Sequence, residues 1–204
     1  MTQTARRADL VTEQQRLESI ERLGLLYTPA EERFDRITRL ASRIFATPIA
    51  TLTIVAERRM WFKSRVGTDV SELSREDGFA PVAMNHPGPL VVPDALADPR
   101  FARCALVVNA PYARFYAGVA IRSPEGARIG ALGVIDTEPR HVADAELVYL
   151  RDLAAVAEDE MHRRHLDSAQ GDMIRELGEA RRRSMVDRKS TRLNSSHSSV
   201  SRMP

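Results

Sequence analysis

The sequence predicts an α+β fold in which an antiparallel sheet carries its main helices on one face. Two observations lead to this class. Apolar residues recur at helical spacing over residues 13–45 and again over residues 142–183. Short β-prone runs joined by turns fill the middle of the chain, and strands joined by hairpins pair antiparallel. Strands kept apart from helices along the chain are typical of α+β folds rather than of alternating α/β folds.

Two helices are expected before the first strand. Residues 13–26 carry leucines and one isoleucine at helical spacing, with charged residues between them. A second helix is expected to open at Thr28, which can cap it, with Pro29 at the first helical position and Glu31 as the acid of a capping box. Pro48 is expected to end this helix, because proline cannot continue it.

The middle of the chain predicts a first hairpin and then smaller pieces. Strands are expected over residues 49–55 and 60–66, and in the second of them alternation predicts Trp61, Lys63 and Arg65 on one face. The pieces that follow are a polar loop, a short helix, a short strand and a long irregular connection, expected at residues 67–77, 79–84, 90–93 and 98–113. Long connections in compact domains are often binding loops.

The clearest local signal is a second hairpin over residues 115–136. Two apolar, β-prone runs flank Ser123-Pro124-Glu125-Gly126, which has proline and glycine where a type I turn prefers them. Three small residues, Gly118, Gly130 and Gly133, are set into these strands and would allow close packing by helices or by a ligand.

The C-terminal part, residues 142–184, predicts a long helix that pairs with a partner helix. Its apolar positions are spaced three and four apart, as in a coiled-coil seam: Leu147, Leu150, Ala154, Ala157 and Met161. A second seam, in a different phase, consists of Leu166, Met173, Leu177 and Ala180. The change of phase predicts a break in the helix near Gly171.

Composition narrows the functional classes. The chain of 204 residues has 43% hydrophobic residues and no apolar run of the roughly 20 residues that span a membrane. The N-terminus, residues 1–12, lacks the apolar core of a secretory signal and is expected to be flexible. A single cysteine, Cys104, excludes an internal disulfide framework. A cytoplasmic protein without a membrane partner is expected.

The charge distribution argues against nucleic-acid binding. The net charge is +2, and residues 188–204 carry four basic residues and no acid, so subtracting those charges leaves −2 for residues 1–187. The basic character therefore belongs to this tail, whose serine-rich composition predicts disorder. The tail also resembles a read-through peptide found at the ends of truncated reading frames, which would make it non-native.

Several segments together resemble a GAF domain of bacterial sensor proteins, with the resemblance covering residues 13–165. The matching segments are ERLGLLYTPAEERFDRITRLASRIF, PIATLTIV, WFKSRVG, PLVVPDALADPRF and RFYAGVAIRSPEGARIGALGVID, followed by the closing helix. The resemblance implies a sheet of about six antiparallel strands with helices packed on one face. It places a pocket on the opposite face, closed by short helices and loops.

The resemblance also implies a role in signalling. Such domains dimerise through their first and last helices, and the last helix carries the signal into an output module. We therefore expect an input domain that binds a small molecule, forms a homodimer, or does both, to control an output domain that is missing from this chain. The output domain is expected to be a histidine kinase, with a cyclic-di-nucleotide enzyme as the other choice. A ligand-free dimerisation module is one alternative. The other is a small redox enzyme that reduces free methionine sulfoxide, but that chemistry needs several thiols.

Departures from the family bear on ligands. Relatives often read SFCAHAI where this chain has Gly78 to Met84, so Ala80 and Val82 replace a cysteine and a histidine. The NKFDE pattern of cyclic-nucleotide-binding relatives is not visible, and no cysteine has a bilin-attachment context. Neither a metal nor a covalent bilin is expected, and no catalytic motif marks the chain as an enzyme.

The candidate pocket residues are aromatic and charged side chains near the expected ligand side of the sheet. They are Trp61, Arg65, Phe79, Asp94, Arg114, Tyr116 and Asp136. Arg114 beside two aromatic residues would suit an anionic ligand. The aromatic residues equally suit core packing, and the two aspartates equally suit turn capping. Cys104 is expected to be a partly buried apolar residue, and His162 and His165 to lie on a solvated helix face.

Overall fold

The computed structural model describes residues 12–197. All but the last residue of the N-terminal segment 1–12 lies outside the described residues, as do residues 198–204. The chain divides into two compact units, residues 1–163 and residues 164–204, each described here by itself. No helix among the described residues is long and apolar enough to cross a membrane.

Six strands form one antiparallel sheet in the order β3-β2-β1-β6-β5-β4. The α+β class predicted from the sequence and the sheet of about six strands implied by the resemblance are confirmed, although the short strand Glu72–Ser74 lies in the segment 67–77 that was expected to be a loop. The strands are β1 (Ile49–Val55), β2 (Arg59–Val66), β3 (Glu72–Ser74), β4 (Leu90–Val92), β5 (Phe115–Arg122) and β6 (Arg128–Asp136). The second hairpin, β5 and β6, lies next to β1, and its turn is closed by a hydrogen bond from the Gly126 amide to the Ser123 carbonyl at 2.8 Å.

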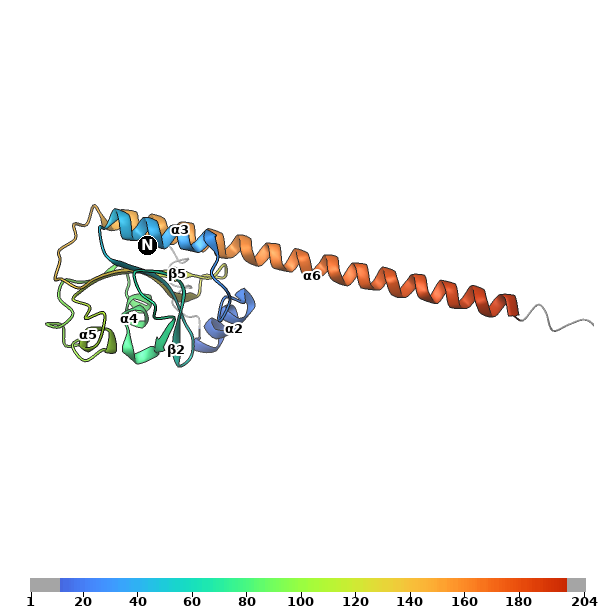
Figure 1. Cartoon of the computed structure of the whole chain (residues 1–204), viewed down its shortest axis with the longest axis horizontal. Helices are drawn as coiled ribbons and strands as arrows, with labels where there is room; N and C mark the ends of the chain where they lie inside the picture. The colour runs from blue at the N-terminus through green and yellow to red at the C-terminus, as the bar shows by residue number, and fades with distance from the viewer. Residues whose placement is uncertain (1–11, 198–204) are drawn as a thin grey trace, which may run out of the picture. The chain divides into compact units, whose positions relative to one another are not determined.

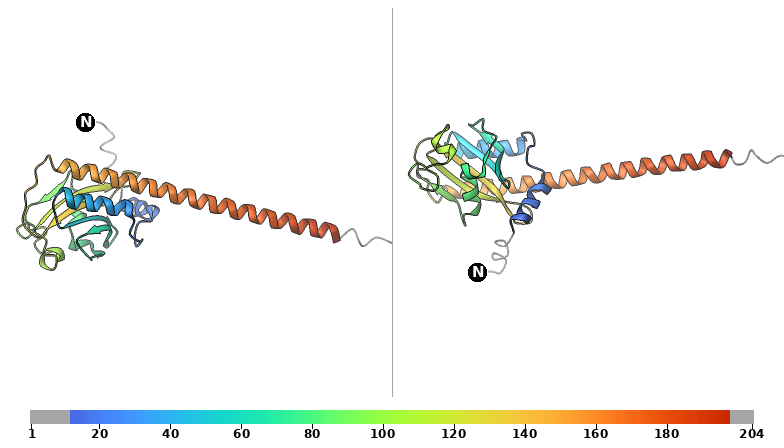
Figure 2. Two further views of the ribbon diagram at one scale, coloured as in Figure 1. Left: turned by 45° about the horizontal axis from the view of Figure 1, so that its top comes forward. Right: turned by 90° about the horizontal axis from the view of Figure 1, so that it is seen from below.

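The helices divide between the two faces of this sheet. They are α2 (Glu13–Leu23), α3 (Glu32–Ile44), α4 (Ala80–Asn85), α5 (Ala105–Val108) and α6 (Leu147–His197). In the first unit, α3 and the first turns of α6 lie side by side across one face, whereas α4 and α5 lie on the other (Figures 1 and 2). Each face has its own apolar core.

The helix-side core contains the seam that was expected to pair with a partner. Leu147, Leu150, Ala154, Ala157 and Met161 are all at most 6% exposed, and they belong to the same cluster as residues of α2, α3 and the sheet. That prediction was wrong, because a helix packed on its own sheet needs the same periodic apolar stripe as a helix packed on a partner.

The opposite core lies between the sheet and the short helices. Phe79, Phe101, Met84 and Tyr116 are its large side chains, each at most 2% exposed. A short 3₁₀-helix, η2 (Arg75–Asp77), precedes α4 within the segment that was expected to be a loop.

Two local predictions at the chain's first half differ from the structure. Helix α3 begins one residue after Glu31, which makes no side-chain capping bond, and the Thr28 hydroxyl donates to the Leu25 carbonyl instead. The predicted capping box is therefore absent, because residues 28–30 approach Lys63 in an extended path before the helix starts.

A β-bulge overturns the predicted alternation in β2. Leu52 pairs with Ser64 and Thr53 with Phe62, so Lys63 has no partner across the ladder. The Ser64 hydroxyl reaches Asp35 and Thr38 of α3, on the helix side, whereas Phe62 belongs to the opposite core. The alternation that puts Trp61, Lys63 and Arg65 on one face would put Ser64 on the other face with Met60 and Phe62. The extra residue at the bulge places Ser64 on the face opposite to Phe62 instead.

Helix α6 continues through Gly171 without the predicted break. A glycine inside a helix costs only about 1 kcal/mol, which neighbouring residues with good helix propensity can offset. The helix is described as far as His197, so it also covers residues 188–197 of the segment whose composition predicts disorder.

Candidate functional site

The face of the sheet that carries α4 and α5 is filled by its own side chains. Only a void of about 10 Å³ remains among its nine lining residues, which are Thr51, Thr53, Met60, Phe62, Phe79, Ala80, Leu106, Tyr116 and Ile135. Small-molecule sites usually offer about 300 Å³ or more, so this face has no room for a ligand in the described state.

Tyr116 occupies most of that face. Gly118 and Gly133 pair across β5 and β6, and the Tyr116 ring lies over both of them. A methyl group on Gly118 would come within 2.0 Å of the Tyr116 hydroxyl, and one on Gly133 within 2.6 Å of its ring. The glycines that were expected to admit a helix or a ligand instead admit this ring.

Phe79 packs on the Tyr116 ring and fills the remaining space beneath α4 and α5. Its ring stacks on Tyr116 with centroids 4.6 Å apart and packs against Phe101 at 4.9 Å. Burial raises the pKa of Tyr116, because the phenolate form would lose its hydration. The two predicted site residues Phe79 and Tyr116 are therefore brought together, as a packed pair.

The charged candidates away from β2 are engaged in local structure. Arg114 donates two hydrogen bonds to the Asp94 carboxylate at 2.8 and 2.7 Å, and this partner lowers the pKa of Asp94. Asp94 also accepts the backbone N–H of Leu96 at 3.1 Å, the bond of an Asx turn.

Asp136 has a comparable local role. It pairs with Arg140 at 2.9 Å and accepts the backbone N–H of Glu138 at 3.3 Å. Arg140 in turn donates to the carbonyls of Phe45 and Ala46 at the end of α3. Asp136 thus helps to anchor the segment that leads from the sheet to α6.

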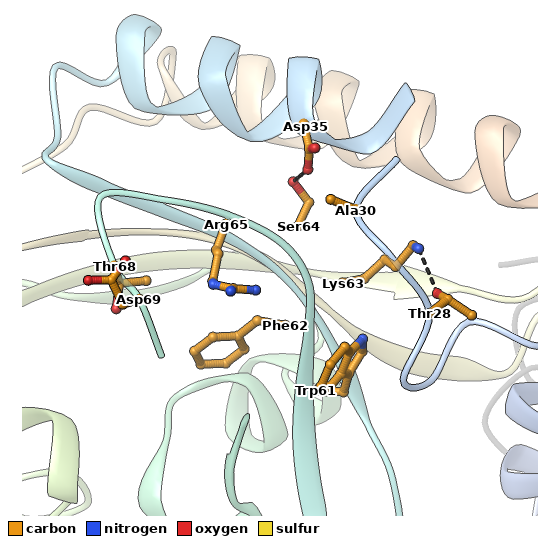
Figure 3. Close-up of a pocket in the computed structure, with 10 residues that line it drawn as sticks. All are labelled: Thr28, Ala30, Asp35, Trp61, Phe62, Lys63, Ser64, Arg65, Thr68 and Asp69. Atoms are coloured by element: carbon orange, nitrogen blue, oxygen red, sulfur yellow. Dashed lines mark hydrogen bonds between the residues drawn. The ribbon is translucent and has the colours of Figure 1, made fainter. Parts of the chain in front are cut away.

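A second hollow, of about 310 Å³, lies along the outer edge of β2 (Figure 3). We call it the β2-edge hollow. It is bounded by β2, by the connection between α2 and α3, and by the loop after β2. Its lining residues are Thr28, Ala30, Asp35, Trp61, Phe62, Lys63, Ser64, Arg65, Thr68 and Asp69. Trp61 and Arg65, two of the predicted site residues, both belong to it. The hollow exists because β3 pairs only with the first part of β2, so the edge beyond Trp61 is left open.

Lys63 is the buried charge of this hollow. Its side chain is fully buried, and its ammonium donates to Thr28 at 2.7 Å and to the Pro29 carbonyl at 2.8 Å, and pairs with Glu31 at 2.6 Å. Sequence reasoning did not single out Lys63, because the bulge that turns it inward leaves no signal in the residue pattern.

Trp61 and Arg65 differ in their surroundings. The Trp61 indole Nε1 is buried and has no hydrogen-bond partner among the described residues. Its ring packs on Tyr27, with centroids 5.0 Å apart. Arg65 is exposed, and its guanidinium extends across Phe62 into the hollow (Figure 3).

The outer surface of α3 and α6 exposes large apolar side chains. On α3, Leu40 and Ile44 are 50% and 46% exposed, and on α6, Tyr149 and Val156 are 54% and 44% exposed. Two contacts set the helices antiparallel, one from Arg36 to Glu160 at 2.8 Å and the one from Arg140 to the end of α3. Half-exposed apolar residues on two neighbouring helices are suited to association with another surface.

The remaining candidates offer little chemistry. Cys104 is buried, its Sγ lies 3.8 Å from the Glu76 carbonyl, and burial raises the pKa of its thiol. A raised pKa disfavours the thiolate that thiol chemistry needs. Among the residues that the structure describes, no group of three His, Cys, Asp or Glu side chains is arranged to hold a metal ion.

The sheet order, the helices on its two faces and the closing helix α6 define a class of α+β domains that recurs in signalling proteins. Residues 29–161 match the GAF domain family, and the chain belongs to that family. It is 37% identical over 144 residues to the cyclic di-GMP phosphodiesterase PA2567 of Pseudomonas aeruginosa. That match covers 70% of this chain and 24% of the relative, so the chain spans about a quarter of the relative's length.

Solved structures share the fold at low identity. One is the GAF domain from Acinetobacter phosphoenolpyruvate-protein phosphotransferase, with a TM-score of 0.55 and 13% identity over 76% of this chain and 97% of that one. Another is the free methionine-R-sulfoxide reductase from Neisseria meningitidis in complex with its substrate, with a TM-score of 0.53 and 18% identity over 81% of this chain and 93% of that one. The second likeness concerns the fold alone.

Proposed function

We propose that this GAF domain is the input module of a signalling protein and acts by forming a homodimer that controls an output domain. The observation that carries the proposal is the exposed apolar surface formed by Leu40 and Ile44 on α3 with Tyr149 and Val156 on α6. The filled face beneath α4 and α5 favours signalling through association over signalling through a ligand held there.

The heptad count along α6 supports a dimer seam. Tyr149 and Val156 stand seven residues apart, and the same repeat carried forward reaches Leu177. The companion positions, three residues further on, are Asp152, Asp159, Leu166 and Met173, and the repeat from Tyr149 to Leu177 passes through Arg163 and Gln170, so four of its nine positions are polar. The second apolar seam of the sequence is therefore in register with Tyr149 and Val156, and not with the residues buried against the sheet. In the second unit Leu166, Met173 and Leu177 are 53%, 64% and 65% exposed.

The output domain is proposed to be a cyclic-di-nucleotide enzyme, with a histidine kinase as the alternative. The relative that is 37% identical over 144 residues carries the name of a cyclic di-GMP phosphodiesterase, which favours the first. The chain itself is proposed to have no catalytic activity, since its one cysteine is buried with a raised pKa.

Native mass spectrometry of the chain tests the association. We expect a dimer at tens of micromolar, and a monomer for a Tyr149→Glu, Val156→Glu variant, because two buried carboxylates would face the partner without compensation. Leu96→Glu is the control, since Leu96 is 51% exposed and lies away from α3 and α6. A chain that is strictly monomeric at this concentration contradicts the proposal.

A chimera tests the control of an output domain. The matching segment of the Pseudomonas phosphodiesterase is replaced by residues 12–163 of this chain, and phosphodiesterase activity is measured. We expect activity to change severalfold when Tyr149→Glu and Val156→Glu are introduced and to stay unchanged with Leu96→Glu. Equal phosphodiesterase activity in all three chimeras would show that the apolar surface of α3 and α6 does not control the output domain.

A further inference from the structure

We propose that the β2-edge hollow binds a small zwitterion, a molecule that carries both a carboxylate and an ammonium group. Two side chains of opposite charge, Arg65 and Asp69, line this hollow and are both exposed. Among the described residues neither makes an ion pair or a side-chain hydrogen bond, either with the other or with a third residue. Figure 3 shows Asp69 at one end of the hollow, Trp61 at the other and Arg65 between them.

The other charged groups of the hollow, Lys63 and Asp35, already have hydrogen-bond partners. Lys63 has three N–H groups, and Thr28, Pro29 and Glu31 accept all of them. Asp35 accepts the Ser64 hydroxyl at 2.6 Å. The charged groups of the hollow that make no side-chain hydrogen bond or ion pair among the described residues are therefore the guanidinium of Arg65 and the carboxylate of Asp69. A simple anion would meet Asp69, and a simple cation would meet Arg65, but a zwitterion satisfies both.

The geometry of these groups suits such a ligand. A guanidinium presents a planar fork of N–H donors that matches a carboxylate with two parallel hydrogen bonds. A carboxylate such as that of Asp69 accepts the N–H groups of an ammonium. The volume of about 310 Å³ lies at the small end of the range for small-molecule sites, which fits a molecule of amino-acid size.

The aromatic residues Trp61 and Tyr27 supply a second, independent indication of a ligand in the β2-edge hollow. The Trp61 Nε1–H is a buried donor without a partner in the described part of the chain, and an unsatisfied buried donor destabilises the fold. Tyr27, which packs on Trp61, is 64% exposed and has φ of 57°, a conformation that is strained for a tyrosine. A ligand oxygen in the hollow would give the Trp61 N–H its acceptor.

The hollow shares Phe62 with the void beneath α4 and α5 and otherwise has different lining residues, and the proposal does not depend on dimerisation. The hollow lies at the edge of the sheet, on the side of the connection between α2 and α3 (Figure 3). Its occupancy would be read from Trp61, the one tryptophan of the chain. Fluorescence and the single indole N–H signal in NMR therefore report on this hollow alone.

The test titrates the full chain with three millimolar probes at constant ionic strength. They are L-glutamine, glutaramate, which is the same molecule without its ammonium group, and γ-aminobutyramide, which lacks the carboxylate. We expect a saturable shift of the indole signal with L-glutamine and binding about tenfold or more weaker with each half-molecule, as expected for losing one charged hydrogen-bond set. No saturable shift with L-glutamine, or equal affinity for a half-molecule, overturns the proposal.

Charge-removing variants locate the site. Arg65→Gln and Asp69→Asn are each expected to lower the affinity for L-glutamine about tenfold to a hundredfold. Arg103→Gln and Glu57→Gln are the matched controls, since both residues are exposed and neither lines the hollow. All four substitutions lie at exposed positions, so the fold is expected to persist in each variant. If L-glutamine shifts the Trp61 indole signal of Arg65→Gln and Asp69→Asn with unchanged affinity, the proposal is overturned.

Discussion

Replacing Tyr116 by alanine tests whether the face beneath α4 and α5 is a packed core. The side chain is 2% exposed, stacks on Phe79 and rests on two glycines. Removing a buried aromatic ring costs about 3–5 kcal/mol through lost transfer free energy and the cavity left behind. For a chain of this length a loss of about 4 kcal/mol lowers the melting temperature by about 8–16 °C.

The same substitution should open a binding site. The void of about 10 Å³ would grow by most of the deleted side chain. We expect p-cresol, which has the shape of that side chain, to bind the Tyr116→Ala variant and to restore part of its melting temperature, because a ligand that binds only the folded state stabilises it. The unsubstituted chain should show no such rescue.

Differential scanning calorimetry with and without p-cresol measures both effects. Tyr112→Ala is the matched control, since Tyr112 is 61% exposed and its loss should change the melting temperature little. A loss below about 1 kcal/mol for Tyr116→Ala, without rescue by p-cresol, would refute the reasoning, because it would mean that the ring does not fill this face.

Two further predictions concern charged groups. Lys63→Met should lower the free energy of unfolding in urea by about 3 kcal/mol, since it leaves the acceptors of a fully buried ammonium unsatisfied, and an unchanged value would contradict the hydrogen bonds described. Arg16 and Arg75 lower the pKa of Glu13 from 4.5 to about 2, so Glu13 stabilises the fold above its ordinary pKa, and that contribution is lost as the pH falls from 4.5 toward 2. Because Glu13 is half exposed, Glu13→Gln should cost only about 0.5–1 kcal/mol at neutral pH and nothing at a pH well below 2, and a cost that does not change with pH would contradict this expectation.

Local patterns in the sequence predicted most of the helices and strands. The hairpin turn at Ser123 to Gly126 and the apolar runs beside it are set by neighbouring residues, and they appear where expected. Side-chain orientations that depend on pairing with residues far away in the sequence could not be predicted from local patterns. Lys63 turns inward because β2 has one residue more than β1 across the bulge, and nothing near Lys63 in the sequence records that mismatch.

The α6 helix shows a second limit of sequence patterns. The seam from Leu147 to Met161 and the seam from Leu166 to Leu177 have the same periodicity, yet only the first is buried in its own domain. The periodicity shows that one side of the helix is apolar. It does not show whether that side packs on the sheet of the same domain or on another helix. The predicted site residues do not form one site. Trp61 and Arg65 line the β2-edge hollow, whereas Phe79 and Tyr116 pack against each other beneath α4 and α5.

Cysteine cross-linking tests the proposed dimer surface most directly. Tyr149→Cys and Val156→Cys are each made in a Cys104→Ser background, and Arg151→Cys, an exposed position on another side of α6, serves as the control. A disulfide forms only when the two Cα atoms lie within about 7 Å. The account predicts cross-linked dimers under mild oxidation for Tyr149→Cys and Val156→Cys and little for Arg151→Cys. Cross-linking through Arg151→Cys alone, or through none of the three, would contradict it.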